Sequence, residues 1–329
     1  MNEFELIAKI TKYAPKRGED LRCGVGDDCA VIAGPGNKDW LVTQDALIEG
    51  VHFRREWTDM ATLGRKTLSV NLSDIAAMGG MPRFYLVSLG MPKDLKSKCA
   101  EQIYAGMHER AQEYGAGLIG GDTVRSLAGL VLSITVIGEI PKGGGLFRCG
   151  ARAGDAIFVT GIVGGAALGL SCLNAGISDG DAACFINRHK DPKPRVAAGK
   201  ILAESKMVSA MIDVSDGVFA DLGHIADASG VGFRIQLADL PVDEGFRSLA
   251  RKIGADPSEL AVAGGEDYEL LFTSRPGFVD KLESKTFAKF KGLCATRIGV
   301  IAREKDKREV IDADGKFFVP AVGGFDHFN

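Results

Sequence analysis

The sequence lacks the features that mark several broad classes of protein. Aromatic residues make up only 7% of its 329 residues, and no apolar run approaches the roughly 18 residues needed to span a bilayer. There are 40 Lys and Arg against 43 Asp and Glu, so the formal net charge of −3 gives no global positive field for nucleic acid or anionic lipid. Neither a membrane nor a nucleic acid is therefore expected as a partner.

Paired cysteine motifs are also missing. The seven cysteines are odd in number and contain no C-x-x-C pair, which argues against a disulfide framework and against a zinc knuckle. The first residues, MNEFELIAKI, carry acids where a secretory signal would carry bases. We therefore expect reduced thiols and a cytoplasmic protein.

The common nucleotide-binding fingerprints are absent as well. No G-x-x-x-x-G-K-[ST] occurs, and CGVGDDC departs from G-x-G-x-x-G at Cys29. TGIVGGAALG at residues 160–169 could present a helix start to a phosphate, although a glycine-rich turn packed for structural reasons is the stronger interpretation. Neither a P-loop nor a Rossmann site is predicted.

What the sequence does contain indicates an α/β (α+β) protein with two mixed domains. Apolar residues amount to 46%, enough for a large core, and the spacing of apolar residues alternates between helical and strand periods. A glycine- and proline-rich stretch at 141–152 predicts a linker between an N-terminal domain, 1–140, and a C-terminal domain, 153–329. In the first half we expect helices over 3–14, 60–78 and 97–114 and strands over 41–47, 84–92 and 129–140. In the second half we expect strands in AIFVTG, SAMIDVSDG, GFRIQL, YELLFTS and TRIGVIA and helices near 164–174, 194–204 and 217–228.

Carboxylates gather beside glycine or small residues at the ends of apolar runs. Any one of them is better explained as a turn former or a helix cap, but burying six such clusters is costly unless cations pair with them. The clusters hold no histidine or cysteine at ligand spacing and no calcium loop, so they indicate Mg²⁺ or Mn²⁺ and a nucleotide-dependent enzyme. They are GVGDDCA with Asp27 and Asp28, VTQDAL with Asp45, VNLSDIAAMGG with Asp74, IGGDT with Asp122, IDVSDG with Asp213 and Asp216, and GGEDYEL with Glu266 and Asp267.

Seven longer motifs carry a resemblance to a known family. GVGDDCAVI, TQDALIEGVHF, KTLSVNLSDIAAMGGMP, LIGGDTVRS, IDVSDGVFADLGHIA, GGEDYELLFT and GGFDHF, in this order and over nearly the whole chain, resemble the thiamine-monophosphate kinases. That family is similar to aminoimidazole ribonucleotide synthetase and selenophosphate synthetase. The resemblance implies their two-domain fold, with the N-terminal domain binding ATP and metal and pairing its sheet across a homodimer.

The resemblance also implies roles for individual residues. It implies several bound magnesium ions, with K⁺ as a further candidate. The family's magnesium ligands correspond to Asp28, Thr43, Gln44, Asp45, Asp74, Asp122, Asp213 and Asp216. Gln44 stands where the family leads us to expect threonine or serine. The ATP contacts correspond to Tyr104, Gly121, Asp122, Arg148 and Ser215, and the contacts to thiamine monophosphate correspond to His52, Glu266 and Phe325. His108, His189, His224 and His327 receive no chemical role.

The implied activity is phosphorylation of thiamine monophosphate to thiamine diphosphate by direct in-line transfer of the γ-phosphoryl group of ATP, assisted by magnesium. The acceptor is a phosphate that is largely ionised at neutral pH, so no general base and no covalent intermediate are expected. Two alternatives stay open. One is another ATP-dependent enzyme such as selenophosphate synthetase, but that enzyme needs a reactive cysteine, and Cys23 and Cys29 lie in the wrong sequence context for it. The other is a metal-dependent nucleotide sensor that binds ATP without turnover.

Overall fold

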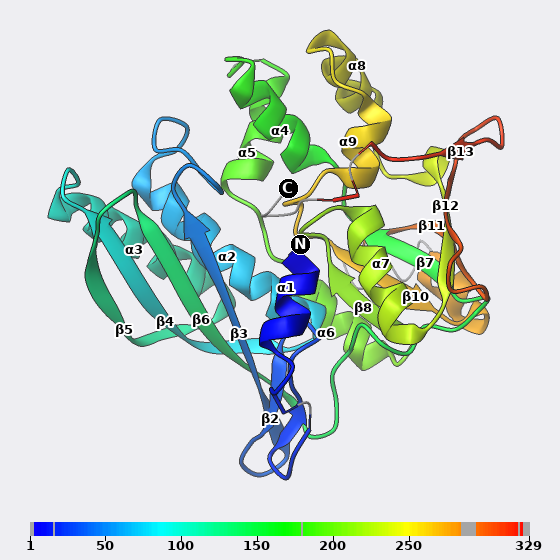
Figure 1. Ribbon diagram of the computed structural model, residues 1–329, viewed down its shortest axis with the longest axis horizontal. Coiled ribbons are helices and arrows are strands. Elements are labelled where there is room, and N and C mark those ends of the chain that lie inside the picture. The colour runs from blue at the N-terminus through cyan, green and yellow to red at the C-terminus, as the bar shows by residue number, and fades with distance from the viewer. Residues whose placement is uncertain (1–2, 16, 179, 284–293, 322, 325–329) are drawn as a thin grey trace.

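The computed structural model describes residues 3–15, 17–178, 180–283, 294–321 and 323–324. Two β-sheets with helices packed on them make up the molecule, and Figure 1 shows them side by side with the N-terminal sheet on the left. This arrangement confirms the predicted fold class of two mixed α/β halves. The predicted end of the N-terminal domain at 140, the linker at 141–152 and the start of the C-terminal domain at 153 stay predictions.

The first sheet has six strands in the order β1-β2-β3-β6-β4-β5, and every neighbouring pair is antiparallel except β4 with β5. Helix α2 packs against β3, β4 and β6, and α3 packs against α2 and β5. The elements are α1 (Glu3–Ile10), β1 (Leu21–Cys23), β2 (Ala30–Ala33), β3 (Lys38–Ile48), α2 (Met60–Ala77), β4 (Met81–Pro92), α3 (Ser97–Tyr114), β5 (Gly117–Ser126) and β6 (Val131–Pro141).

The second sheet has seven strands in the order β13-β12-β9-β11-β7-β10-β8, with β9 and β12 as its parallel pair. Its strands are β7 (Ala156–Thr160), β8 (Val208–Asp213), β9 (Gly232–Gln236), β10 (Leu270–Ser274), β11 (Ala295–Ala302), β12 (Arg308–Ile311) and β13 (Phe317–Phe318). Its helices are α4 (Gly165–Asn174), α5 (Ala182–Lys190), α6 (Val196–Ser205), α7 (Val218–Ser229), α8 (Glu244–Lys252), α9 (Pro257–Ala263) and α10 (Val279–Glu283), with short 3-10 turns η1 (Leu237–Asp239) and η2 (Pro276–Phe278).

Helix α2 joins the two halves, and its sequence explains how. Asp59 caps its start by accepting from the Thr62 N–H at 2.8 Å. A Cβ on Gly64 would lie 2.0 Å from the Ile103 carbonyl oxygen, so only glycine allows α2 and α3 to cross this closely. The helix also contacts α6 and β8 of the second half. Its buried residues therefore belong to a core shared by both sheets, in which Phe158 stacks on Phe272.

A second core lies between the other face of the seven-stranded sheet and helices of the second half. Ile157, Val159 and Ile212 of the sheet meet Leu168 of α4 and Leu222 of α7 there. The sheet is thus covered on both faces, as its continuous apolar strands predict. None of the seven cysteines forms a disulfide. No helix within the described ranges is long and apolar enough to cross a bilayer.

The first sheet, by contrast, is covered on one face only. Residues of β3 alternate, with Leu41 and Leu47 buried toward the helices while Ile48 is 41% exposed on the other face. The edge strand β5 is exposed along almost its whole length and includes Leu118 and Val124. An apolar sheet face and an apolar edge are thus left open in a single chain.

Two expectations need correction. The helix over 3–14 ends at Ile10. The GGDT segment, interpreted as a turn, is part of strand β5, because its backbone pairs in parallel with β4 and this long-range pairing outweighs the poor strand propensity of glycine. Gly121 is needed there, since a Cβ would lie 2.0 Å from the Val87 carbonyl oxygen. Helices α5, α8, α9 and α10 and strands β1, β2, β12 and β13 were not predicted.

Candidate active site

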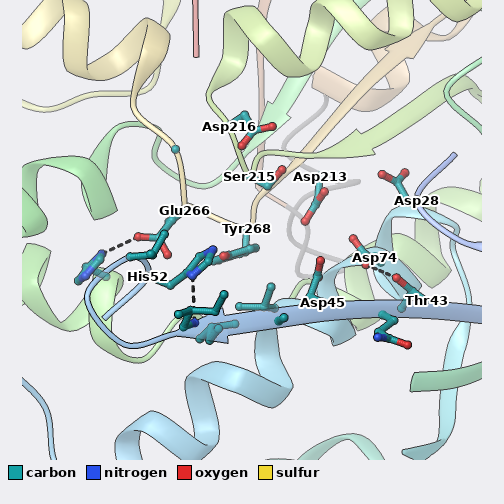
Figure 2. A pocket seen from close by; sticks show the side chains of 18 of the residues that line it. Asp28, Thr43, Asp45, His52, Asp74, Asp213, Ser215, Asp216, Glu266 and Tyr268 are labelled. Atoms are coloured by element: carbon teal, nitrogen blue, oxygen red, sulfur yellow. Dashed lines mark hydrogen bonds and ion pairs between the residues drawn. The ribbon is translucent and has the colours of Figure 1, made fainter. Parts of the chain in front are cut away.

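A cavity of about 650 Å³ lies where β3 and α2 of the first half meet β8 and the segment before β10 of the second half. Figure 2 shows that its lining residues form two groups, with acidic residues around Asp74 at one end and Glu266 with His52 at the other. The predicted site residues that line it are Asp28, Thr43, Gln44, Asp45, His52, Asp74, Arg148, Asp213, Ser215, Asp216 and Glu266.

The acidic end gathers carboxylates from three separate segments. Oxygen atoms of Asp28, in the loop before β2, of Asp74 in α2, and of Asp213 at the end of β8 all lie within 4.8 Å of one another. Asp45 of β3 lines the same end of the cavity (Figure 2). Segments far apart in sequence thus deliver four acids to one place.

The pKa values of these acids show that the cluster is electrostatically costly. Burial is the main cause that raises the pKa of Asp28, Asp45 and Asp74, and it raises the pKa of Asp213 to about 7. Repulsion from neighbouring carboxylates further raises the pKa of Asp45, Asp74 and Asp213, whereas Arg148 lowers the pKa of Asp28 against the effect of burial. Acids of this kind hold their negative charge most readily when cations bind them.

Hydroxyl and amide groups fix the orientation of the acids. Thr43 Oγ1 donates to Asp74 Oδ2 and Ser73 Oγ donates to Asp213 Oδ2, each at 2.5 Å. The backbone N–H of Asp45 donates to Asn71 Oδ1 at 2.9 Å. Polar residues on the buried face of α2 therefore support the acidic end, and the sequence prediction missed Ser73 and Asn71.

A second group of possible ligands lies where the turn after β8 meets the first turns of α7, with Asp216 in the turn and Asp221 and His224 in the helix. Ligand atoms of Asp216, Asp221 and His224 lie within 4.8 Å of one another. One oxygen of Asp221 accepts from the backbone N–H groups of Ser215, Asp216 and Gly217, which shapes this turn. His224, given no role from sequence, is placed beside Asp216, and burial lowers its pKa to about 4.

The residues at the opposite end surround Glu266. Its Oε1 lies 2.8 Å from Lys66 Nζ and its Oε2 lies 2.9 Å from His189 Nδ1. His52 Nδ1 accepts from the Ile48 N–H at 3.1 Å. Neither Lys66 nor His189 receives a role from the sequence. A lysine among the small and apolar residues of KTLSVNLSDIAAMGG was a signal that could have found the first of them.

The next acid along the chain, Asp267, has a structural task. Its carboxylate accepts from the N–H groups of Gly164 at 2.5 Å and Ala166 at 2.9 Å, at the start of α4. A carboxylate therefore already caps the helix start in TGIVGGAALG, as the structural interpretation of that motif requires.

Several predicted residues do not join the acidic end. The Gln44 amide points to the other face of β3, where its Nε2 lies 3.2 Å from Ser133 Oγ. Gly121 and Asp122 lie on β5, and Tyr104 of α3 contacts the neighbouring Thr123. Register pairs Asp45 with Ile134, Ile134 with Val87 and Val87 with Gly121, so about 14 Å separates Gly121 from Asp45 at about 4.8 Å per strand. Phe325 lies outside the described residues.

The donor set at the acidic end fits magnesium. It consists of carboxylate oxygens, the ligands that this hard cation prefers. The Asp28 side chain is fully enclosed, and its Oδ2 has no hydrogen-bond partner among the described residues. An orphaned, enclosed carboxylate oxygen in the middle of three acids is a position where a cation is needed.

Comparisons with known proteins agree with this picture. Residues 26–140 match the family model of the AIR synthase related protein N-terminal domain, and residues 152–312 match that of the C-terminal domain. The fold and the acidic cavity thus define an AIR synthase related protein. The chain belongs, within this class, to the thiamine-monophosphate kinase family, because it is 39% identical to one member and 33% identical to another over its full length.

Individual relatives support this assignment. The thiamine-monophosphate kinase of Bacillus subtilis is 39% identical over all of both chains, and that of Escherichia coli K12 is 38% identical over 82% of each. Among solved structures, AaThiL complexed with AMPPCP and TMP superposes with a TM-score of 0.85 at 33% identity, covering 99% of this chain and 97% of the other.

Proposed function

We propose that this protein phosphorylates thiamine monophosphate to thiamine diphosphate by direct, in-line transfer of the γ-phosphoryl group of ATP. The observation that carries the proposal is the division of one cavity into an acidic end around Asp28, Asp74 and Asp213 and a second end around Glu266 and His52. One end suits metal-bound phosphates and the other suits an organic substrate. A relative in complex with AMPPCP and TMP supports the same pairing of ligands.

Electrostatics explains why such a reaction needs this cavity. Two phosphate groups must meet end to end, and two unit charges about 4 Å apart repel by about 4 kcal/mol at an effective dielectric constant near 20. When bound, magnesium ions supply positive charge that offsets this repulsion and that stabilises the transferred group. We propose Asp28, Asp45, Asp74, Asp213 and Asp216 as the residues of this cavity that hold them, with Thr43 beside Asp74.

The residues themselves then have positioning tasks. Arg148 and Ser215 face the acidic end, where a guanidinium and a hydroxyl can bind phosphate oxygens. Glu266 and His52 orient the thiamine part, whose thiazolium ring carries a positive charge. The acceptor phosphate is ionised at neutral pH, so we assign no general base and no covalent intermediate. A role for K⁺ stays a prediction.

We further propose that the enzyme works as a homodimer in which the open faces of two N-terminal sheets meet. The exposed Leu118 and Val124 on β5 and the half-exposed second face of the sheet support this. Register pairs Asp122 with Ser88, Ser88 with Ser133 and Ser133 with Ala46, so Asp122 belongs to the sheet face opposite to the one that carries Asp45. Asp122 would reach a nucleotide in the cavity through the β5 edge of a second copy.

The test is an assay of ADP release with ATP and magnesium, run separately with thiamine monophosphate, selenide and an aminoimidazole ribonucleotide precursor. We expect ADP and thiamine diphosphate in equal amounts with thiamine monophosphate only. Turnover with selenide would favour the selenophosphate synthetase alternative. Binding of ATP without turnover on any substrate would favour a nucleotide sensor.

A further inference from the structure

Glu266 is held from two sides by residues of different segments. Lys66, from the middle of α2, is buried with only 2% of its side chain exposed, and its Nζ lies 2.8 Å from Glu266 Oε1. His189, at the end of α5, is also buried, and its Nδ1 lies 2.9 Å from Oε2. Each oxygen of the carboxylate therefore lies next to its own partner, with Lys66 as the stronger one, because His189 Nδ1 is close to Oε2 but does not meet the geometry of a hydrogen bond.

Lys66 also reaches the second residue proposed for the substrate. Its Nζ donates to the carbonyl oxygen of His52 in a long hydrogen bond of 3.5 Å. His52 is fixed at its ring as well, because its Nδ1 accepts from the Ile48 N–H. One buried ammonium group thus connects both residues at the substrate end of the cavity.

The segment that carries Glu266 needs such fixing. Glu266 has φ of 66° and Tyr268 has φ of 51°, a left-handed conformation that costs residues other than glycine of order 1 kcal/mol or more each. Backbone hydrogen bonds from Glu266 N–H to the Ser215 carbonyl at 2.7 Å and from Tyr268 N–H to that of Val214 at 2.9 Å hold the chain. These backbone hydrogen bonds do not fix the Glu266 side chain, whose orientation depends on the contacts of its carboxylate.

His189 is anchored independently of Glu266. Two residues further along, the Asp191 carboxylate accepts from Arg65 Nε of α2 at 3.1 Å and from Arg110 of α3. The end of α5 is therefore tied to the same helices that carry Lys66. The packing of α5 on α2 and α3 therefore fixes the positions of Lys66 and His189 relative to each other.

The charges around Glu266 keep it ionised. Burial opposes ionisation, but the Lys66 ammonium and the contact with His189 outweigh it and lower the pKa of Glu266. Burial and the charge of Lys66 lower the pKa of His189, which favours its neutral form. A carboxylate offers about four acceptor positions, so after these two contacts Glu266 can still accept from a ligand.

We propose that Lys66 is a positioning residue for substrate, acting through Glu266, with His189 as its second support. Building on the proposed function, this assigns recognition of the thiamine part to the direction in which the Glu266 carboxylate is held. Lys66 already balances the negative charge of Glu266, so the substrate does not meet a free negative charge. Lys66 and Glu266 together select a ligand group that donates a hydrogen bond to a carboxylate in a fixed orientation.

The experiment compares Lys66→Met, Glu266→Gln and the double variant in steady-state kinetics, varying thiamine monophosphate and ATP in turn. For Lys66→Met we expect the KM for thiamine monophosphate to rise about tenfold or more, with the KM for ATP changed by less than about twofold. The double variant should match Glu266→Gln, because Lys66 acts through Glu266. Lys38→Met is the matched control, since Lys38 Nζ lies 2.6 Å from Glu139 Oε1 outside the cavity.

The outcomes separate the proposals. Wild-type turnover with unchanged KM values in Lys66→Met would overturn the positioning role and leave the proposed function intact. A wild type without turnover on thiamine monophosphate would overturn both. If Lys66→Met does not fold, Lys66→Arg decides, because it keeps the positive charge but places the hydrogen-bond donors differently. A raised KM for thiamine monophosphate with an unchanged KM for ATP supports the proposal, and unchanged KM values for both substrates contradict it.

Discussion

Arg148 holds Asp28 through one oxygen atom and leaves the other without a partner. Its Nη2 and Nε lie 2.6 and 3.1 Å from Asp28 Oδ1, while Oδ2 is buried with no hydrogen bond among the described residues. The guanidinium thus balances one acid of the cluster, and the charges of Asp28 and its neighbours raise the pKa of Arg148 above its usual value although burial opposes this. Arg148 and a bound cation would stabilise the same carboxylate from two sides.

This relationship predicts how Arg148→Gln alters stability. Without the guanidinium, the enclosed Asp28 loses the positive partner that it has among the described residues, and the metal-free protein should lose about 1–3 kcal/mol of unfolding free energy. Magnesium should then raise the melting temperature more in the variant than in the wild type, because the ion replaces the missing charge. Thermal denaturation with EDTA and with magnesium measures both effects. Arg251→Gln is the control, since Arg251 is 63% exposed and lies 3.6 Å from Glu244.

Asp45→Asn and Asp122→Asn should each reduce phosphoryl transfer about a hundredfold or more with folding intact, because each removes an anionic ligand from ions that stabilise the transition state. Turnover at saturating magnesium and circular dichroism measure the two quantities. Near-normal rates in either variant would contradict its role.

The same two variants test whether the site is shared between two chains. If Asp45 of one chain and Asp122 of the other serve one nucleotide, a mixed dimer of the variants contains one intact site. Refolding the two inactive variants together should restore about one quarter of wild-type activity, because half of randomly formed dimers are mixed and each has one of two sites intact. Mixtures that stay as inactive as the separate variants would place both residues in the site of a single chain.

The open β5 edge predicts the oligomeric state. Light scattering at low micromolar concentration should give twice the 34.9 kDa of one chain for the wild type. Leu118→Glu combined with Val124→Glu should give the monomer mass, because charges would be buried where two sheets meet. Phe317→Glu, at another exposed apolar residue, should keep the dimer. A wild-type mass near 34.9 kDa would refute the proposal.

Asp267 predicts a pH dependence of stability. Burial raises its pKa to about 7, above the value of about 3.9 in an unfolded chain. Between these values the folded form binds the extra proton, so this group makes stability fall as pH rises from about 4 to 7, by at most about 4 kcal/mol. Asp267→Asn removes this term, so the stability advantage of the wild type over the variant should shrink across that interval. Urea denaturation in EDTA at several pH values measures it, and a constant difference would contradict the assignment.

Local patterns in the sequence determined much of the fold. Helices α2 and α3 lie where apolar spacing predicts them. Helix α3 buries one face, whose residues repeat with the helical period of 3.6 whatever the helix packs against. Helix α2 is buried on almost every side, which the tertiary structure decided. The long strands β3, β4 and β6 likewise follow from short apolar runs. The acidic motifs and their order were sufficient for the family, since each motif is contiguous in the chain.

Only the tertiary structure decided how these parts meet. Strand β5 exists because β4 offers a backbone partner to a glycine-rich segment that has little strand propensity of its own. The contact between Lys66 and Glu266 joins α2 to the segment before β10, far away in the sequence, and no local period encodes such a pair. Gln44 and Asp45 are neighbours in sequence, yet the pleat of β3 directs them to opposite faces, so only the Asp45 side chain reaches the acidic end.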